Sequence, residues 1–288
     1  MQIPGIIDFH THVFPEAIAS RAIAQLSAAS HTKAFTDGTE GGLMASMRAA
    51  GISLSVILPV ATHPRQVIKV NDSALRINEN TRDTGLLSFG CMHPDFEDWH
   101  DELGRIHAAG SKGIKLHPVY QGVDFDDPRY LRILNRAAEL GLHVLIHAGL
   151  DVGFPGAVNA SPKMIVNALR AVGPMSLILA HMGGWRCWDE VLDLLPPTSV
   201  RLDTSFSLGA MTPNGDGHYR QAEELALLNG AAFIKLIRTF GANRILFGTD
   251  SPWADQAAEL AALTSLTLTD EEKRLILGGN ARRLLGIN

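Results

Sequence analysis

The chain has 288 residues, of which 46% are hydrophobic and 19% are charged, with a formal net charge of −5. This balance provides no basic surface for nucleic acid, and no apolar segment approaches the roughly 20 residues that a membrane-spanning helix needs. The N-terminus carries neither the basic start nor the apolar run of a secretory signal, and two cysteines are too few for a disulfide framework. These features predict a cytoplasmic globular protein with no nucleic-acid or membrane partner.

Short apolar runs alternate along the chain with longer stretches of helical periodicity. This is the pattern of buried parallel strands joined by crossover helices. The strands expected are 5–9, 54–58, 86–92, 113–116, 144–146, 176–180, 200–203 and 244–247. The helices expected are 16–29, 42–50, 63–82, 128–140, 162–172, 185–195, 222–240, 254–263 and 270–285.

Eight strands, each with a helical partner, recur at roughly the 30-residue spacing of a β/α unit. No linker or change of composition divides the chain, so one domain over residues 1–288 is expected. The simplest closed arrangement is an α/β fold, the (β/α)8 or TIM barrel, which is typically about 250 residues long. An open doubly wound sheet is the alternative, but no glycine-rich phosphate turn follows the first strand, which favours the barrel.

The expected strands end in side chains that bind metals. In such barrels the active site forms at the carboxyl ends of the strands. His10 and His12 end the first strand and point to the same face, because successive side chains of a strand alternate. The later strands end in His93, Lys115, His117, His147, His181 and Asp250. Packing alone does not explain why side chains that can bind a metal end several separate strands, so a metal site is expected at the strand ends.

Five of these segments together resemble the metal-dependent amidohydrolase superfamily, in the branch that groups small hydrolases with non-oxidative decarboxylases. The likeness covers essentially the whole chain, with the order of the strands preserved. The segments are His10-x-His12, Gly113-Ile114-Lys115-Leu116-His117-Pro118, Ile146-His147, Ala180-His181-Met182-Gly183-Gly184 and Phe247-Gly248-Thr249-Asp250-Ser251-Pro252.

This resemblance implies one divalent ion, Zn²⁺ or another such as Mn²⁺, held by His10, His12, His147 and Asp250. Such an ion lowers the pKa of a bound water to near 7. Asp250 would also take the proton of the attacking water, and His181 would polarise the substrate carbonyl or act as an acid or base. In some members of the superfamily a carboxylated lysine bridges two metals, so Lys115 and His181 are candidates for a second ion, although one ion is expected.

Four side chains are candidates for binding the substrate, and each has a structural alternative. Lys115 would contact a substrate anion or form a buried ion pair, and His117 would line the pocket or end its strand. Arg186 would clamp a substrate carboxylate or pair with a neighbouring acid, and Trp253 would wall the pocket or fill the core.

Asp8 precedes His10 on the same face, where it would accept a hydrogen bond from a ligating imidazole or belong to polar packing. The long connections 31–42 and 206–229 are expected to form lids over the barrel mouth, and neither carries a recognisable binding motif.

The predicted function is metal-dependent hydrolysis of a small carbonyl-containing substrate such as an amide, lactone or ester. A carboxy-lyase that uses the same metal to release carbon dioxide is the leading alternative. Phosphoester hydrolysis would need more cationic side chains around the metal than Lys115 and Arg186. A metal-binding barrel without catalysis is a further alternative. Barrels of this kind commonly dimerise, so a homodimer is one expected assembly.

Overall fold

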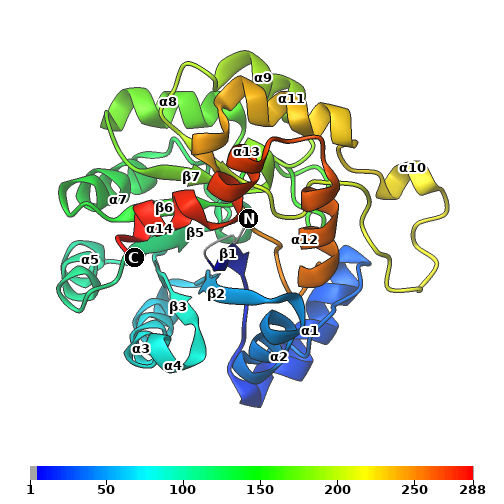
Figure 1. Ribbon diagram of the computed structural model, residues 1–288. Helices are drawn as coiled ribbons and strands as arrows, with labels where there is room; N and C mark the ends of the chain where they lie inside the picture. Colours follow the sequence, from blue (N-terminus) through cyan, green and yellow to red (C-terminus); the bar gives the residue numbers. More distant parts are fainter. Residues whose placement is uncertain (1–4, 288) are drawn as a thin grey trace. The chain divides into compact units, whose positions relative to one another are not determined.

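The computed structural model describes residues 5–287, and it divides the chain into two compact units. The first unit contains the described residues up to Ile57, residues 152–154, and the chain from Asp203 onward. The second contains Leu58–Asp151 and Pro155–Leu202. Both units consist of short parallel strands followed by helices, as the sequence predicts (Figure 1).

In the first unit, neighbouring parallel segments bring the ends of three strands together. The main-chain amide of Phe9 donates to Phe247, and that of Thr204 donates to Leu246. The elements of this unit are β1 (Ile6–Thr11), which pairs in parallel with β2 (Ile52–Ile57), α1 (Glu16–Ser30), α2 (Glu40–Ala50), the end of β8 (Arg201–Asp203), α10 (Ala222–Leu225), α11 (Gly230–Phe240), η3 (Ala242–Arg244), β9 (Ile245–Leu246), α12 (Gln256–Ser265), α13 (Asp270–Arg274), the π-helical turn η4 (Leu275–Gly279) and α14 (Asn280–Leu285).

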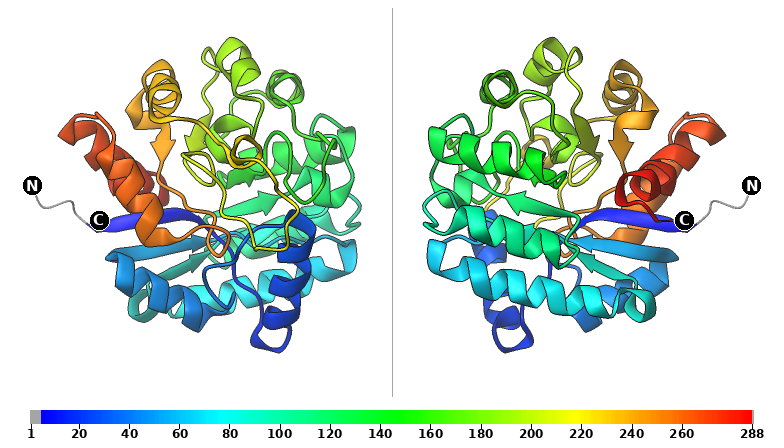
Figure 2. Two further views of the ribbon diagram at one scale, coloured as in Figure 1. Left: turned by 90° about the vertical axis from the view of Figure 1, so that its right-hand side faces the viewer. Right: turned by 90° about the vertical axis from the view of Figure 1, so that its left-hand side faces the viewer.

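The second unit is a parallel sheet in the order β4-β5-β6-β7-β8, with strand residues that are almost all buried. Its helices lie along the sheet in sequence order (Figure 2). Its elements are η1 (Pro64–Gln66), α3 (Val67–Glu79), α4 (Thr81–Thr84), β3 (Leu86–Ser88), β4 (Gly90–Cys91), α5 (Trp99–Ala108), β5 (Gly113–Leu116), α6 (Pro118–Gln121), α7 (Pro128–Glu139), β6 (His143–Ile146), α8 (Pro162–Val172), β7 (Leu177–Leu179), η2 (His181–Gly183), α9 (Trp188–Leu194) and the start of β8.

The helices that cover the second unit begin where the sequence places their caps. Asp127 caps α7 by accepting from the amide of Arg129, with Pro128 in the first turn. Ser161 caps α8 by accepting from the amide of Met164. Both helices bury an apolar stripe, which in α7 consists of Tyr130, Ile133, Leu134 and Ala137. Among the residues described, no helix is both long and apolar enough to cross a membrane.

The predicted helices 63–82 and 270–285 are each divided into shorter helical segments. Two other expected elements are interrupted because a side chain or a distant main-chain group takes their hydrogen bonds. The predicted strand 86–92 splits into β3 and β4, since the amide side chains of Asn78 and Asn71 on α3 bind the main chain of Ser88 and Cys91. The predicted helix 222–240 splits into α10 and α11. Leu228 donates its amide to Ser207 instead of continuing a helix, and the next residue starts α11 as its cap.

The two long connections of the first unit contact one another. Lys33 donates its amide to Thr212, and Asn214 donates its amide to His31. Nδ1 of His31 lies 2.7 Å from a carboxylate oxygen of Asp216. The segment after β8 therefore runs along the C-terminal end of α1 (Figure 2), and the role of these two connections as lids stays a prediction.

Candidate metal centre

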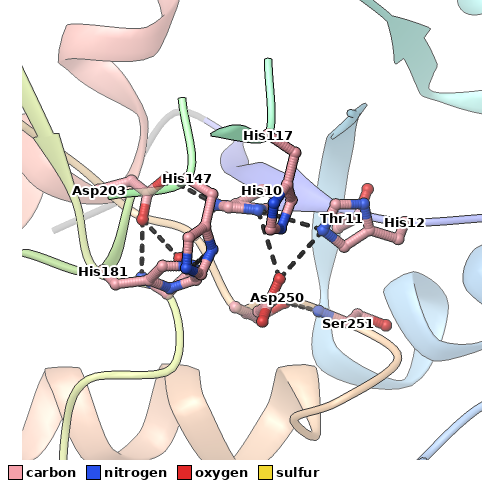
Figure 3. A network of polar contacts seen from close by, with 12 residues as sticks. His10, Thr11, His12, His117, His147, His181, Asp203, Asp250 and Ser251 are labelled. Atoms are coloured by element: carbon pink, nitrogen blue, oxygen red, sulfur yellow. Dashed lines mark hydrogen bonds and ion pairs between the residues drawn. The ribbon is translucent and has the colours of Figure 1, made fainter. Parts of the chain in front are cut away.

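Three of the predicted ligands meet in the first unit. Nε2 of His10 and Nε2 of His12 are 3.2 Å apart. Oδ1 of Asp250 lies 3.1 Å from Nε2 of His12 and 3.3 Å from Nε2 of His10. The side chain of His10 is buried, and those of His12 and Asp250 are 17% and 12% exposed. The two imidazoles point toward the carboxylate (Figure 3).

The separations of these three atoms fit a divalent cation. Ligands held about 2.0–2.1 Å from a tetrahedral zinc ion are separated from one another by about 3.3–3.4 Å. The observed edges of 3.2, 3.1 and 3.3 Å are close to that value. Two imidazole nitrogens and one carboxylate oxygen are also a ligand set that zinc accepts. The residues present therefore fit the metal that the resemblance implies.

Main-chain bonds between β1 and the loop after β9 hold the three side chains in place. The pleat of β1 puts His10 and His12 on one face. Asp250 has a left-handed backbone (φ 70°), and its amide donates to the carbonyl of His10 at 2.8 Å. The amide of His12 donates to Ser251 at 2.6 Å. Main-chain hydrogen bonds therefore join the two histidines near the N-terminus to the loop that carries Asp250.

Gly248 permits the close approach of β1 to this loop. A Cβ at residue 248 would lie 2.8 Å from Cβ of His10 and 3.5 Å from Cβ of Asp203. Thr204 fixes this glycine on both sides, because its hydroxyl donates to the carbonyl of Gly248 and accepts from its amide, each at 2.9 Å. The absence of a side chain here is therefore what makes room for His10.

Asp203 and Ser205 belong to this centre and were missed from the sequence. Oδ2 of Asp203 lies 2.7 Å from Nδ1 of His10, and both residues are fully buried. The hydroxyl of Ser205 lies 3.0 Å from the same nitrogen. Asp203 ends the predicted strand 200–203, so the rule that selected the other strand ends would also have selected it.

Asp8 connects β1 to the loop and to α12. It accepts from the amides of His10 and Thr249, from the hydroxyl of Thr249, and from the side-chain amide of Gln256 at 2.7 Å. Burial raises the pKa of Asp8 to about 7, against these hydrogen bonds, which favour the carboxylate. Of the two roles expected for Asp8, polar packing is confirmed, because it binds the main-chain amide of His10 and not its ring.

A separate group of buried side chains lies at the strand ends of the second unit. Oδ2 of Asp151 is 3.5 Å from Nε2 of both His117 and His147. Nε2 of His147 is 2.8 Å from the carbonyl oxygen of Leu150, and its Nδ1 is 3.0 Å from Nε2 of His181. Asp151 was also missed from the sequence, although it follows His147 by only four residues.

This second group is held together by hydrogen bonds. A carbonyl oxygen only accepts, so Nε2 of His147 carries a proton toward Leu150, and Nδ1 accepts the proton of His181. The rings of His117 and His147 are stacked, with centroids 4.3 Å apart and planes 14° from parallel, so a single ion would not lie in the planes of both rings. For His147 to bind a metal, one of its two contacts must break, and its role as a ligand stays a prediction.

The remaining predicted site residues divide between the units. Lys115 lies in β5 and is 1% exposed, and His117 follows it at the end of the strand. Arg186 is exposed, with its guanidinium over the ring of Trp185. Trp253 belongs to the first unit, where it is half-buried and its amide donates to the carbonyl of Asp250. The roles of these residues toward a substrate stay predictions.

Three solved structures show the same fold. An uncharacterised TIM-barrel protein from Bordetella bronchiseptica is similar with a TM-score of 0.73 and 18% identity, over 98% of each chain. The 2,6-dihydroxybenzoate decarboxylase from Rhizobium has a TM-score of 0.69 and 16% identity, over 99% of each chain. A probable 2-pyrone-4,6-dicarboxylic acid hydrolase from Acinetobacter baumannii has a TM-score of 0.62 and 17% identity, over 98% of this chain and 100% of the other.

The fold class is therefore the (β/α)8 TIM barrel, as predicted. Proteins of this family and fold are enzymes, among them decarboxylases and hydrolases. No curated protein matches the chain. The sequence matches the Amidohydrolase family over residues 7–287, which is nearly its whole length, and the protein belongs to that family.

Proposed function

We propose that this enzyme is a metal-dependent hydrolase that attacks a small carbonyl-containing substrate, such as an amide, lactone or ester, with an activated water. The observation that carries the proposal is the partly buried triangle formed by Nε2 of His10, Nε2 of His12 and Oδ1 of Asp250, whose edges suit a divalent ion. We propose zinc, or another divalent ion such as manganese, at a stoichiometry of one.

A bound ion of this kind supplies a Lewis acid and a water of lowered pKa. His10 in β1 and His12 directly after it would hold the ion through their Nε2 atoms, which lie 3.2 Å apart. We propose that the carboxylate of Asp250, 3.1 Å from Nε2 of His12, would accept the proton of the attacking water and return it to the leaving group. The roles that the resemblance implies for His147 and His181 stay predictions.

A second candidate reaction is non-oxidative decarboxylation of an aromatic or unsaturated acid. The observation that favours it is the likeness to the 2,6-dihydroxybenzoate decarboxylase over 99% of the chain. In that reaction the metal would polarise a substrate carbonyl or hydroxyl group, and carbon dioxide would leave without water entering the product.

Turnover in ¹⁸O-labelled water separates the two reactions. The metal-loaded enzyme is tested on a panel of lactones, amides and benzoate-type acids, with mass spectrometry of the product and measurement of released carbon dioxide. One ¹⁸O atom in the product supports hydrolysis, and carbon dioxide without ¹⁸O in the product supports decarboxylation.

Two variants test the proposed proton acceptor. Asp250→Asn should lose activity, and Asp101→Asn, a matched change at an exposed carboxylate on α5, should retain it. Equal activity of Asp250→Asn and the parent would contradict the role of Asp250.

A further inference from the structure

We infer that Asp203, together with Ser205, is a positioning residue that fixes the tautomer of His10 and so directs the lone pair of Nε2 toward the proposed metal. The inference rests on the proposed metal site and adds to it two residues that bind no metal themselves. It is carried by four contacts among three fully buried residues of the first unit, three between side chains and one from the main-chain amide of Ser205.

The contact between Asp203 and His10 determines which ring nitrogen carries the proton. Oδ2 of Asp203 lies 2.7 Å from Nδ1 of His10, a distance typical of a charge-assisted hydrogen bond. An ionised carboxylate only accepts, so Nδ1 must be the donor. In a neutral imidazole the other nitrogen is then an acceptor. Nε2 of His10 therefore faces Nε2 of His12 and Oδ1 of Asp250 with its lone pair.

Ser205 supports the same assignment from an independent set of contacts. Its hydroxyl donates to Oδ1 of Asp203 at 2.5 Å, and its amide donates to the same oxygen at 3.1 Å. Because the one hydroxyl proton is donated to Asp203, the hydroxyl oxygen acts as an acceptor toward Nδ1 of His10, which lies 3.0 Å away. The proton on Nδ1 is thus shared by two acceptors. In the opposite tautomer, Oδ2 of Asp203 would face the lone pair of Nδ1, and the hydroxyl of Ser205 would have to give up its bond to Oδ1 to donate to that nitrogen.

The same contacts predict what an amide at residue 203 would do. The amide N–H of Ser205 requires an acceptor at Oδ1, so the carbonyl oxygen of an asparagine would take that place. Its NH₂ group would then face Nδ1 of His10 and donate to it. The ring would be forced to carry its proton on Nε2, where the metal must bind. Asp203→Asn therefore preserves shape and reverses the tautomer, a signature that a merely structural role would not produce.

The experiment compares the parent with Asp203→Asn, Ser205→Ala and a matched control, Asp216→Asn. The control removes a carboxylate that lies 2.7 Å from Nδ1 of another histidine, His31, but on the exposed surface. Histidine-selective ¹⁵N NMR of the metal-free proteins reports the tautomer, with the His10 signal assigned by its loss in His10→Ala. Zinc affinity is measured by competition with a chromophoric chelator, and thermal unfolding checks that each variant folds.

We expect a proton on Nδ1 of His10 in the parent and in Asp216→Asn, and on Nε2 in Asp203→Asn. Zinc affinity should fall about 10- to 100-fold in Asp203→Asn, less in Ser205→Ala, and by less than about twofold in Asp216→Asn. A proton on Nε2 in the metal-free parent would overturn the inference, and so would unchanged zinc affinity in folded Asp203→Asn.

Three further outcomes also decide the matter. If Asp203→Asn does not fold, the tautomer of the parent and the zinc affinity of Ser205→Ala decide the inference. If the parent binds zinc through His10 but catalyses neither proposed reaction, the proposed function fails and the inference stands. If the parent binds no divalent ion, both the proposed function and the metal-directing role of Asp203 fail.

Discussion

Replacing Gly248 by alanine tests whether the packing around His10 sets the geometry of the metal centre. The added methyl carbon would lie 2.8 Å from Cβ of His10, whereas ordinary carbon contacts are 3.4–4 Å, so one of the two must move by about 0.6 Å or more. Residue 248 is held by two hydrogen bonds to Thr204, so we expect the displacement to fall on His10, whereas Cβ of Asp203, at 3.5 Å, stays in ordinary contact.

Such a displacement exceeds what a metal site tolerates, because ligand distances are kept within about 0.2 Å. We expect a loss of unfolding free energy of about 1–3 kcal/mol from overpacking. Zinc affinity should fall at least about tenfold, which corresponds to about 1.4 kcal/mol. Urea unfolding of the metal-free protein gives the first quantity and chelator competition gives the second.

The matched control is Gly41→Ala in α2, where the nearest atom to the new methyl carbon is 3.7 Å away. This variant should match the parent in metal affinity and be equally or more stable, since alanine favours a helix. If Gly248→Ala binds zinc as tightly as Gly41→Ala, the argument that close packing positions His10 is refuted.

Asp127→Ala should destabilise the protein by about 1 kcal/mol near neutral pH, through loss of the cap of α7. Hydrogen bonds from the side chain and amide of Arg129 lower the pKa of Asp127 to about 2. The stabilisation by the Asp127 carboxylate is therefore fully present above the unfolded-state pKa of 3.8 and is lost as the pH falls through about 2. Urea unfolding at neutral and at acid pH measures the loss in Asp127→Ala and its pH dependence. Gln121→Leu should cost about 2–4 kcal/mol by the same measurement, because two main-chain carbonyls of the second unit lose the buried donor that Gln121 provides. Zinc at 100 times its Kd should stabilise the parent by about 2.7 kcal/mol, and a chelator should reverse the effect; Asp250→Asn should show no such zinc dependence.

The strand and helix pattern was predictable because it depends on local sequence. Apolar runs long enough for buried strands alternate with amphipathic stretches, and caps such as Ser161 mark where helices start. The pairing of His10 with His12 followed from the pleat of one strand. The meeting of these two with Asp250 followed from the rule that parallel strands carry their site at one end, joined to the family resemblance.

The features that were not predicted depend on contacts between residues far apart in the sequence. The split of strand 86–92 is produced by the side chains of Asn71 and Asn78 on a neighbouring helix, and no local pattern encodes it. Asp203 lies 193 residues from His10, and only the folded chain brings its carboxylate to the ring. The same strand-end rule would have made residue 203 a candidate site residue, but it would not have predicted the contact of residue 203 with Nδ1 of His10.

Anomalous diffraction from crystals grown with zinc tests the central claim most directly. We predict one strong peak at the zinc edge, within about 2.0–2.2 Å of Nε2 of His10, Nε2 of His12 and a carboxylate oxygen of Asp250. The peak should be absent in crystals of Asp250→Asn soaked at the same zinc concentration. A peak coordinated by His117 and Asp151, with none at His10 and His12, would contradict the account.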